Sequence, residues 1–236
     1  MLFRSAHALF PKASIGRMDS DTMTTRRSYQ DMLQSFRAGR THILIGTQMI
    51  AKGLHFPNCT LVGVLCADMG LHIPDFRAGE RTFQLLVQVA GRSGRGEQEG
   101  RVIIQTYTPY HPALQHALRH DFAGFYRDEI ADRVALDFPP AAHMVMVHVR
   151  GPEAAAVCKA AEEFAARLRE VLPAGVRMGD AAPAPIAKIR AQYRYQICLR
   201  GTAVRAMTKA LRGIVLSARL GKGIEVYADV DPRSLM

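Results

Sequence analysis

Short apolar runs alternate with longer runs of helical spacing along the first half of the chain. Because apolar residues three and four positions apart form one face of a helix, helices are predicted over 24–38 and 76–90. The apolar face of the second helix consists of Phe83, Leu86, Val87 and Ala90. Compact apolar runs predict strands over 14–18, 42–46, 60–66 and 101–106. Strands separated by helices predict an α/β fold, with a mostly parallel sheet and helices on both faces.

The second half of the chain follows a different order. A helical stretch over 111–137 ends at Phe138-Pro139-Pro140, and since proline interrupts regular structure we place a domain boundary there. The residues that follow predict the order β-α-β-β-α-β, which is the ferredoxin-like α+β arrangement. Its strands are expected at 143–150, 176–179, 194–199 and 224–229, its helices at 153–172 and 203–218, and a proline-rich loop at 181–187. The predicted division is a first domain over 1–110, a helical connector over 111–138 and a second domain over 139–236.

The charge of the chain indicates an anionic partner. The net charge is +10, and 48% hydrophobic with 22% charged residues is the composition of a folded globular protein. Residues 1–138 hold 16 basic and 13 acidic side chains, whereas residues 139–236 hold 15 and 8. Most of the excess charge therefore lies in the shorter second half, which favours nucleic acid as the partner over a membrane surface.

Neither a membrane nor a metal is expected to bind this chain. No apolar run approaches the roughly 18 residues that a membrane helix needs, and the first ten residues do not form a signal peptide, so we expect a cytoplasmic protein. No two cysteines form a C-x-x-C pair, and no histidine stands near one at metal-ligand spacing. We therefore expect free thiols and no zinc or other metal site at Cys59, Cys66, Cys158 and Cys198.

Two loops carry the strongest chemical signals. Residues 46–53 follow a buried-type strand, and residues 88–95 read Q-V-A-G-R-S-G-R. In this order they resemble motifs V and VI of superfamily 2 helicases, in which arginines stabilise the charge that develops on the γ-phosphate of ATP. Catalytic roles are thus expected for Gln88, Arg92 and Arg95. The glycines at the ends of the first loop, with His55 beside it, are expected to approach the nucleotide, and the polar residues between them to contact DNA: Gly46, Thr47, Gln48, Lys52, Gly53 and His55.

A second DNA-binding surface is predicted in the C-terminal half. Basic and aromatic residues alternate at Lys188, Arg190, Tyr193 and Arg194, where cations would pair with phosphates and a tyrosine ring could stack on an unpaired base. The helix that follows adds Arg205, Lys209 and Arg212 on one face. An exposed strand and a solvated helix face are the alternative interpretation of the same pattern.

Five segments in a fixed order resemble the PriA family of primosomal replication-restart helicases. They are residues 46–65, 74–96, 101–115, 182–196 and 229–236. The resemblance implies a RecA-like second helicase lobe followed by a C-terminal DNA-binding domain. It also implies a 3′-to-5′ DNA helicase that hydrolyses ATP with Mg²⁺, binds stalled replication forks and restarts replication by primosome assembly. Single-strand-binding protein and primosome components are the partners that it implies.

The sequence lacks parts that such a helicase needs. No G-x-x-x-x-G-K-[ST] phosphate loop is present, nor are the paired cysteines of the zinc insert that the family carries. ATP and Mg²⁺ would therefore be held mainly by a missing lobe, and we expect this chain alone to be a truncated, monomeric and inactive C-terminal part. Two alternatives remain open: a non-catalytic fork- or DNA-binding module, and another superfamily 2 DNA translocase.

Overall fold

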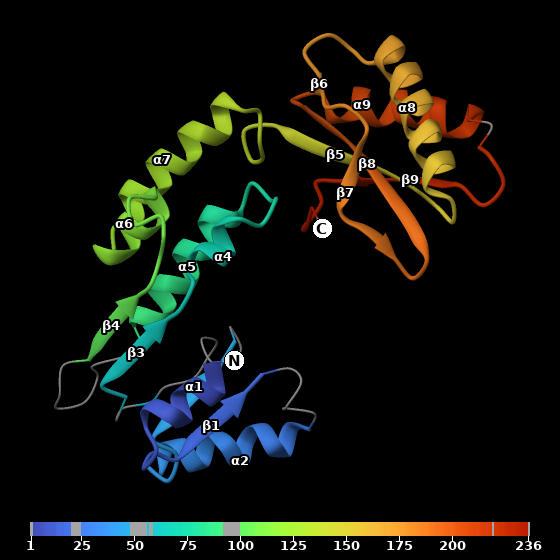
Figure 1. Ribbon diagram of the computed structural model, residues 1–236. Coiled ribbons are helices and arrows are strands. Elements are labelled where there is room, and N and C mark those ends of the chain that lie inside the picture. The colour runs from blue at the N-terminus through green and yellow to red at the C-terminus, as the bar shows by residue number, and fades with distance from the viewer. Residues whose placement is uncertain are drawn as a thin grey trace. The chain divides into compact units, whose positions relative to one another are not determined.

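The computed structural model describes residues 2–19, 25–47, 56, 59–91, 100–218 and 220–235. The chain forms two compact units, one made of residues 1–72 and 79–122, the other of residues 73–78 and 123–236. The second unit therefore takes a six-residue segment from the middle of the first. Each unit is described separately below (Figure 1).

The first unit contains two pairs of parallel strands among its described residues. Strand β1 (Ile15–Met18) pairs with β2 (Ile43–Gly46), and β3 (Leu61–Val64) pairs with β4 (Arg101–Ile104). All four strands lie within the segments predicted from the apolar runs, and the parallel pairing agrees with the expected α/β architecture. The helices of this unit are α1 (Leu2–Leu9), α2 (Arg26–Arg37), α4 (Asp68–Leu71), α5 (Ala78–Ala90) and α6 (Pro112–Leu118).

Helices α2 and α5 show why the sequence predicted them. The Thr25 hydroxyl accepts a hydrogen bond from the Ser28 amide and caps α2, and Leu33 of α2 packs with Met18 and Phe56 in a small core. Helix α5 buries Thr82, Phe83, Leu86 and Val89. The predicted face was partly wrong, since Val87 and Ala90 are only half-buried. The periodicity identified the helix correctly, but the centre of its buried face is rotated toward Val89.

The second unit is an antiparallel sheet covered on one face by two helices. Its strands are β5 (His143–Gly151), β6 (Arg177–Met178), β7 (Ala182–Ile189), β8 (Gln192–Gly201) and β9 (Glu225–Val230), and its helices are α7 (Phe122–Ala135), α8 (Ala154–Val171) and α9 (Val204–Ser217). The sheet order is β6-β8-β5-β9, with β7 also paired to β8. Without β7, this is the predicted ferredoxin-like order, and Figure 1 shows α8 and α9 on the same side of the sheet.

Strand β7 is the main correction to the predicted fold, because residues 181–187 were expected to form a loop. Proline cannot donate a hydrogen bond to a strand ladder, so Pro183 and Pro185 argued against a strand. However, within the described part of the chain β7 pairs only with β8, and at an edge the missing amide hydrogens do not interrupt a second ladder. The register also shifts between Pro183 and Lys188, which places the irregular residues in a bulge.

The core of the second unit lies between the sheet and its two helices. Alternate residues of the central strands are fully buried, and they pack against the apolar faces of α8 and α9. The cluster consists of Val145, Val147, Phe164, Ala165, Leu168, Ile197, Leu199, Met207, Leu211 and Ile214. Side chains at the intervening positions of β5, β8 and β9 therefore lie on the opposite face of the sheet, which α8 and α9 do not cover.

Candidate nucleotide and nucleic-acid sites

The first predicted loop begins at the carboxyl end of a parallel strand. Gly46 is the last residue of β2, opposite Met18 of β1, and both Gly46 and Thr47 are exposed. Ligands of α/β sheets gather at the carboxyl ends of strands, so this position is suited to nucleotide or DNA contact. The remaining predicted residues of the loop, Gln48, Lys52, Gly53 and His55, lie outside the described residues.

The second predicted loop follows helix α5. Gln88 is exposed near the carboxyl end of α5, between the buried Leu86 and Val89. Its side chain therefore points away from the packed face and is free of a core-packing role. Arg92 and Arg95 lie outside the described residues, so their catalytic assignment stays a prediction.

Asp68 is a buried acid that the sequence analysis missed. Its carboxylate accepts hydrogen bonds from the Thr106 hydroxyl at 2.8 Å, the Tyr107 amide at 3.0 Å and the Thr108 hydroxyl at 2.6 Å. The hydrogen bonds from Thr108, together with those from Thr106 and Tyr107, hold the pKa of Asp68 well below its usual range. Asp68 follows β3 and its partners follow β4, so this ionised carboxylate ties together the ends of two neighbouring strands.

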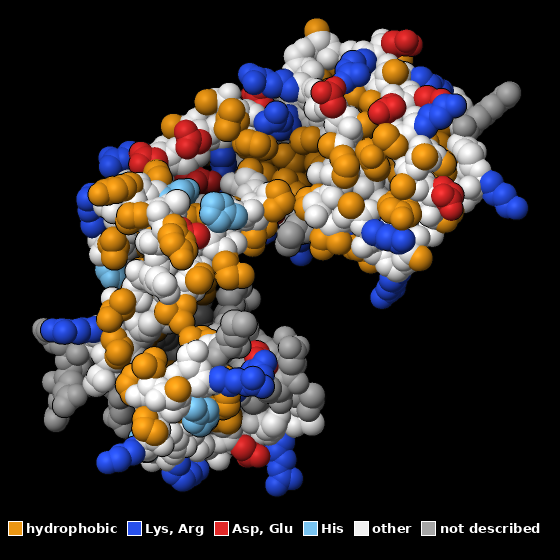
Figure 2. Space-filling model, viewed as in Figure 1, with side chains coloured by type: hydrophobic (Ala, Val, Ile, Leu, Met, Phe, Trp, Pro, Cys, Tyr) orange, Lys and Arg blue, Asp and Glu red, His pale blue; other side chains and the backbone are white. Residues whose placement is uncertain are grey.

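The predicted basic and aromatic residues of the second unit meet at the β7–β8 hairpin. Arg190 and Ala191 form its two-residue turn, with φ of +48° and +63°, and Ile189 pairs with Gln192 on either side. Two successive positive φ values are those of the type I′ turn that fits the twist of a hairpin. The turn exposes the Arg190 side chain, and Figure 2 shows Lys and Arg side chains where Figure 1 draws the hairpin.

Lys188 and Tyr193 are brought together by the strand register. They are directly paired across the hairpin, the ammonium nitrogen lies 3.2 Å from the phenol oxygen, and it stands over the tyrosine ring at 4.4 Å from the centroid. Tyr193 also packs against the cluster that contains Val149 and Val157. Lys188 and this cluster hold the Tyr193 ring in position, and its stacking on an unpaired base stays a prediction.

Arg194 points to the opposite face of the sheet. It pairs with Arg150 of β5, which in turn pairs with Glu225 of β9 and forms an ion pair with it at 2.6 Å. The guanidinium of Arg194 makes a long contact of 3.5 Å with the Ile186 carbonyl. The hydrogen bond to Glu225 raises the pKa of Arg150, and this carboxylate already neutralises the Arg150 cation. Arg194 is therefore the better placed of the two arginines to bind an added anion.

Helix α9 carries the predicted cationic stripe. Arg205, Lys209 and Arg212 are exposed, while Met207, Leu211 and Ile214 of the same helix are buried in the core. The amphipathic pattern thus places the cations on the solvent side, where they could meet phosphates.

The described residues show neither a metal cluster nor a membrane helix. No group of three or more His, Cys, Asp or Glu side chains is close enough to hold a metal ion within the described part of the chain. Cys59, Cys66, Cys158 and Cys198 are free thiols, and burial raises the pKa of Cys59 and Cys198. In the same described ranges, every helix is too short or too polar to cross a bilayer.

Comparison with known proteins assigns both halves of the chain to families. Residues 2–97 match the helicase conserved C-terminal domain, and residues 134–233 match the primosomal protein N C-terminal domain. The chain is 41% identical to the replication restart protein PriA of Bacillus subtilis over 97% of its own length and 29% of that protein. It is 41% identical to the PriA of Treponema pallidum, over 98% of the chain and 35% of the relative, and 35% identical to that of Haemophilus influenzae, over 96% and 31%. The chain thus spans about a third of the length of these curated relatives.

Proposed function

The chain belongs to the PriA family of replication restart proteins, and on this basis we propose that it forms the second helicase lobe and the C-terminal DNA-binding domain of an ATP-dependent 3′-to-5′ DNA helicase. The helicase would bind stalled replication forks and restart replication by primosome assembly. The observation that carries the proposal is the order of the two matched domains, which together occupy most of the chain. We also propose the division into a first domain over 1–110, a connector over 111–138 and a second domain over 139–236. The protein would act in the cytoplasm and bind single-strand-binding protein and primosome components.

The proposed ATP site includes Gln88, Arg92 and Arg95. In the intact helicase the two arginines would stabilise charge on the γ-phosphate of ATP, with Gln88 beside them. The exposed position of Gln88 on α5 supports this assignment, and so does the exposed Gly46 at the carboxyl end of β2. Hydrolysis of ATP with Mg²⁺ would supply the free energy for translocation, and Mg²⁺ would be held mainly by residues that this sequence lacks.

The proposed DNA-binding surface consists of the β7–β8 hairpin and α9. The exposed Arg190 at the turn, the neighbouring Lys188 and Arg194, and the stripe on α9 provide cations for phosphates. Thr47, Gln48 and Lys52 would contact the strand along which the helicase moves. Since phosphate contacts release counterions, the affinity is expected to fall steeply as salt increases.

The proposal can be tested with the purified chain and forked DNA. Fluorescence anisotropy should show salt-sensitive binding, weakened by replacing Arg190 and Arg194 with alanine and unchanged by Arg40→Ala, a matched exposed cation in the first unit. Failure to bind forked, single-stranded and duplex DNA at low salt would overturn the DNA-binding part.

The enzymatic part has a separate test. The purified chain is expected to hydrolyse no ATP when DNA is added, whereas a protein that also carries a phosphate-loop lobe should do so and should lose the activity with Arg92→Ala. A DNA-stimulated ATPase in the chain alone, abolished by Arg92→Ala, would contradict the division of the site between two lobes.

A further inference from the structure

The face of the second unit's sheet that α8 and α9 leave uncovered carries an ordered row of polar and aromatic side chains. His148 of β5 lies directly opposite Gln196 of β8 on one side and Tyr227 of β9 on the other. Strand alternation places all three on the face opposite the core residues Val147 and Ile197. We call Gln196, His148 and Tyr227 the base row. Of these, the tyrosine is the most open, with 42% of its surface exposed.

The base row already contains an aromatic stack. The rings of His148 and Tyr227 are 4.9 Å apart between centroids and inclined by only 20°. The guanidinium of Arg150 stands over the Tyr227 ring at 5.6 Å from the centroid. A flat, partly exposed stack of this kind offers π-faces to a further planar group. Any of the four nucleobases can stack on an aromatic side chain, because each has a π-face.

Two polar atoms of the base row are buried without a hydrogen-bond partner among the described residues. They are Nδ1 of His148 and Oε1 of Gln196. Buried polar atoms are nearly always paired, so each of these marks a place where a partner is missing. The terminal torsion of a glutamine amide is soft, and the Gln196 side chain is partly exposed, so its carbonyl can turn toward a group that docks on this face.

A cationic row lies beside the base row on the same face. It consists of Arg194 and Arg150, two residues along β8 and β5 from Gln196 and His148. Positions two apart on one strand are separated by roughly 6.6 Å, so a cation and a π-face stand side by side at the scale of a single nucleotide. Arg194 also lies close to the hairpin turn that exposes Arg190, so the phosphate backbone of a DNA strand has a path from the base row to the turn.

The protonation state of His148 suits contact with a base rather than with a phosphate. Burial lowers the pKa of His148, the Arg194 cation lowers it further, and Asp229 opposes both effects in part. A neutral imidazole can donate through one ring nitrogen and accept through the other. The row thus combines an amide, a neutral imidazole and a phenol ring, which are groups that recognise the edge and face of a base.

We propose that the base row is a docking site for one unpaired nucleobase of single-stranded DNA. The base stacks on the Tyr227–His148 pair, a base N–H donates to the Gln196 carbonyl, and Arg194 binds the adjoining phosphate. The inference rests on the proposed DNA-binding function and deepens it, because it divides binding into a phosphate part at the hairpin and a base part at the row. Duplex DNA, whose bases are paired, would use only the first part.

The test compares two single strands that differ only in their bases. One is an oligonucleotide of mixed sequence, and the other has the same length with abasic residues in its central segment. The purified chain is expected to bind the base-bearing strand about ten-fold more tightly, since stacking of one base contributes at this scale. Tyr227→Ala and Gln196→Ala should remove this difference and leave the affinity for the abasic strand unchanged, whereas Tyr227→Phe should keep most of it.

The controls separate this inference from the proposed function. Tyr126→Ala removes a tyrosine of similar exposure on α7 and should change neither affinity, and circular dichroism of Tyr227→Phe and Tyr227→Ala checks that the sheet is folded. If the wild-type chain binds both strands equally, or if Tyr227→Ala weakens both to the same extent, the base row is not a base-docking site and the DNA-binding proposal stands. If neither strand binds, both proposals fail.

Discussion

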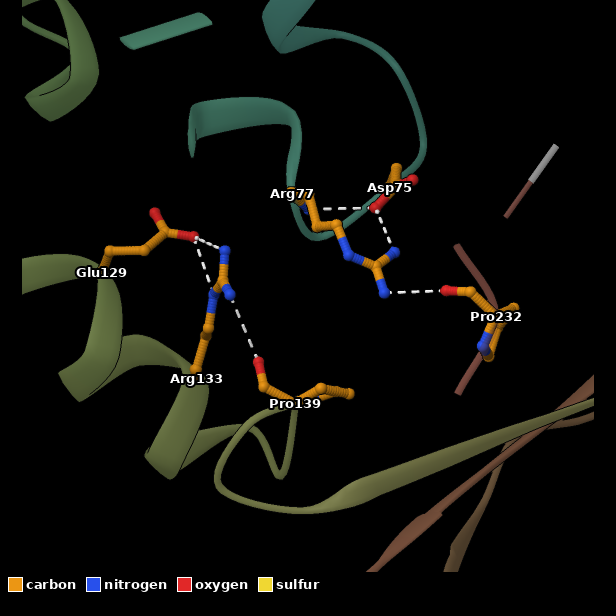
Figure 3. A network of polar contacts seen from close by, with 6 residues as sticks. All are labelled: Asp75, Arg77, Glu129, Arg133, Pro139 and Pro232. Carbon is orange, nitrogen blue, oxygen red and sulfur yellow. Dashed lines mark hydrogen bonds and ion pairs between the residues drawn. The ribbon is translucent and has the colours of Figure 1, made fainter. Parts of the chain in front are cut away.

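The strongest stability prediction concerns Arg77, which joins the segment 73–78 to Pro232 (Figure 3). Its guanidinium donates to the Pro232 carbonyl at 2.7 Å and lies 3.3 Å from a carboxylate oxygen of Asp75, whose side chain is fully buried. It also stands over the Phe76 ring at 4.1 Å from the centroid. We expect Arg77→Ala to destabilise the second unit strongly, because three contacts are lost at a site where only 22% of the arginine side chain is exposed.

The magnitude follows from these contacts. A hydrogen bond from a charged group contributes about 1.5–3 kcal/mol, and a partly desolvated cation–π contact adds about 1 kcal/mol. Asp75 keeps the hydrogen bond that its carboxylate accepts from the Arg77 amide at 3.0 Å, so it is not left entirely uncompensated. We therefore expect the free energy of unfolding to fall by about 3 kcal/mol, at the lower end of the roughly 3–5 kcal/mol that follows when a buried charge loses its partner.

Urea denaturation followed by circular dichroism gives the free energy of unfolding. Hydrogen exchange shows which part of the unit loses stability in the variant. The exchange of the Met144 amide, which donates to Asp231 beside Pro232, should accelerate with that of the rest of β5. Arg212→Ala, an exposed arginine on α9, is the matched control and should change the stability by less than about 0.5 kcal/mol. A similarly small effect of Arg77→Ala would refute the reasoning, as would strict additivity with Asp75→Asn in a double-mutant cycle.

Asp68→Asn should lower the melting temperature at pH 7. The pKa of the Asp68 carboxylate is depressed in the folded chain, so its contribution to stability is fully present above the unfolded pKa of about 4 and is lost as the pH falls below that value. The difference in melting temperature between variant and wild type should therefore shrink as the pH is lowered from 7 to 3. Arg190→Ala should reduce the slope of log affinity against log salt by about one for forked DNA, and an unchanged slope would mean that this arginine contacts no phosphate. A chelator should leave the melting temperature of the purified chain unchanged, because no predicted role requires a metal within it; a chelator-induced drop reversed by zinc would contradict this. Gln88→Ala in a helicase that carries both lobes should lower DNA-stimulated ATP hydrolysis without lowering DNA affinity, and an equal loss of both would place Gln88 on the DNA instead.

Most of the fold was predictable because its signals are local. The helical spacing in α5 and α8 and the strand alternation in β5 are repeated several times in succession, so one ambiguous residue does not hide the element. Strand β7 and helix α1 escaped prediction for different reasons. The prolines of β7 are tolerated only because tertiary structure leaves it at an edge, and α1 has only eight residues, too few for the helical spacing to repeat.

The candidate sites were less predictable than the fold, because they depend on residues that are distant in sequence. The alternation of basic and aromatic residues identified the β7–β8 hairpin as a candidate DNA-binding site, but it could not show that the Lys188 ammonium lies over the Tyr193 ring. Likewise, no local pattern connects His148 with Gln196 and Tyr227, whose proximity depends on the sheet order β8-β5-β9. Asp68 is a comparable case, since its partners lie 38 to 40 residues away. A prediction from one sequence identifies such residues only when a family motif happens to include them.

The contact between Arg77 and Pro232 has a consequence for the order in which the chain can fold. Its two residues are 155 positions apart, so Pro232 is synthesised long after Arg77. Phe76, which stacks on Phe138 at 5.0 Å, is likewise synthesised before every strand of the second unit's sheet. During translation the segment 73–78 cannot make this contact until Pro232 has been synthesised, and the loop closed by the contact carries a large entropic cost before the contact forms. The second unit should reach its native state only after Pro232 has left the ribosome, and removal of residues 231–235 should prevent its completion although every helix and strand of the unit is still present.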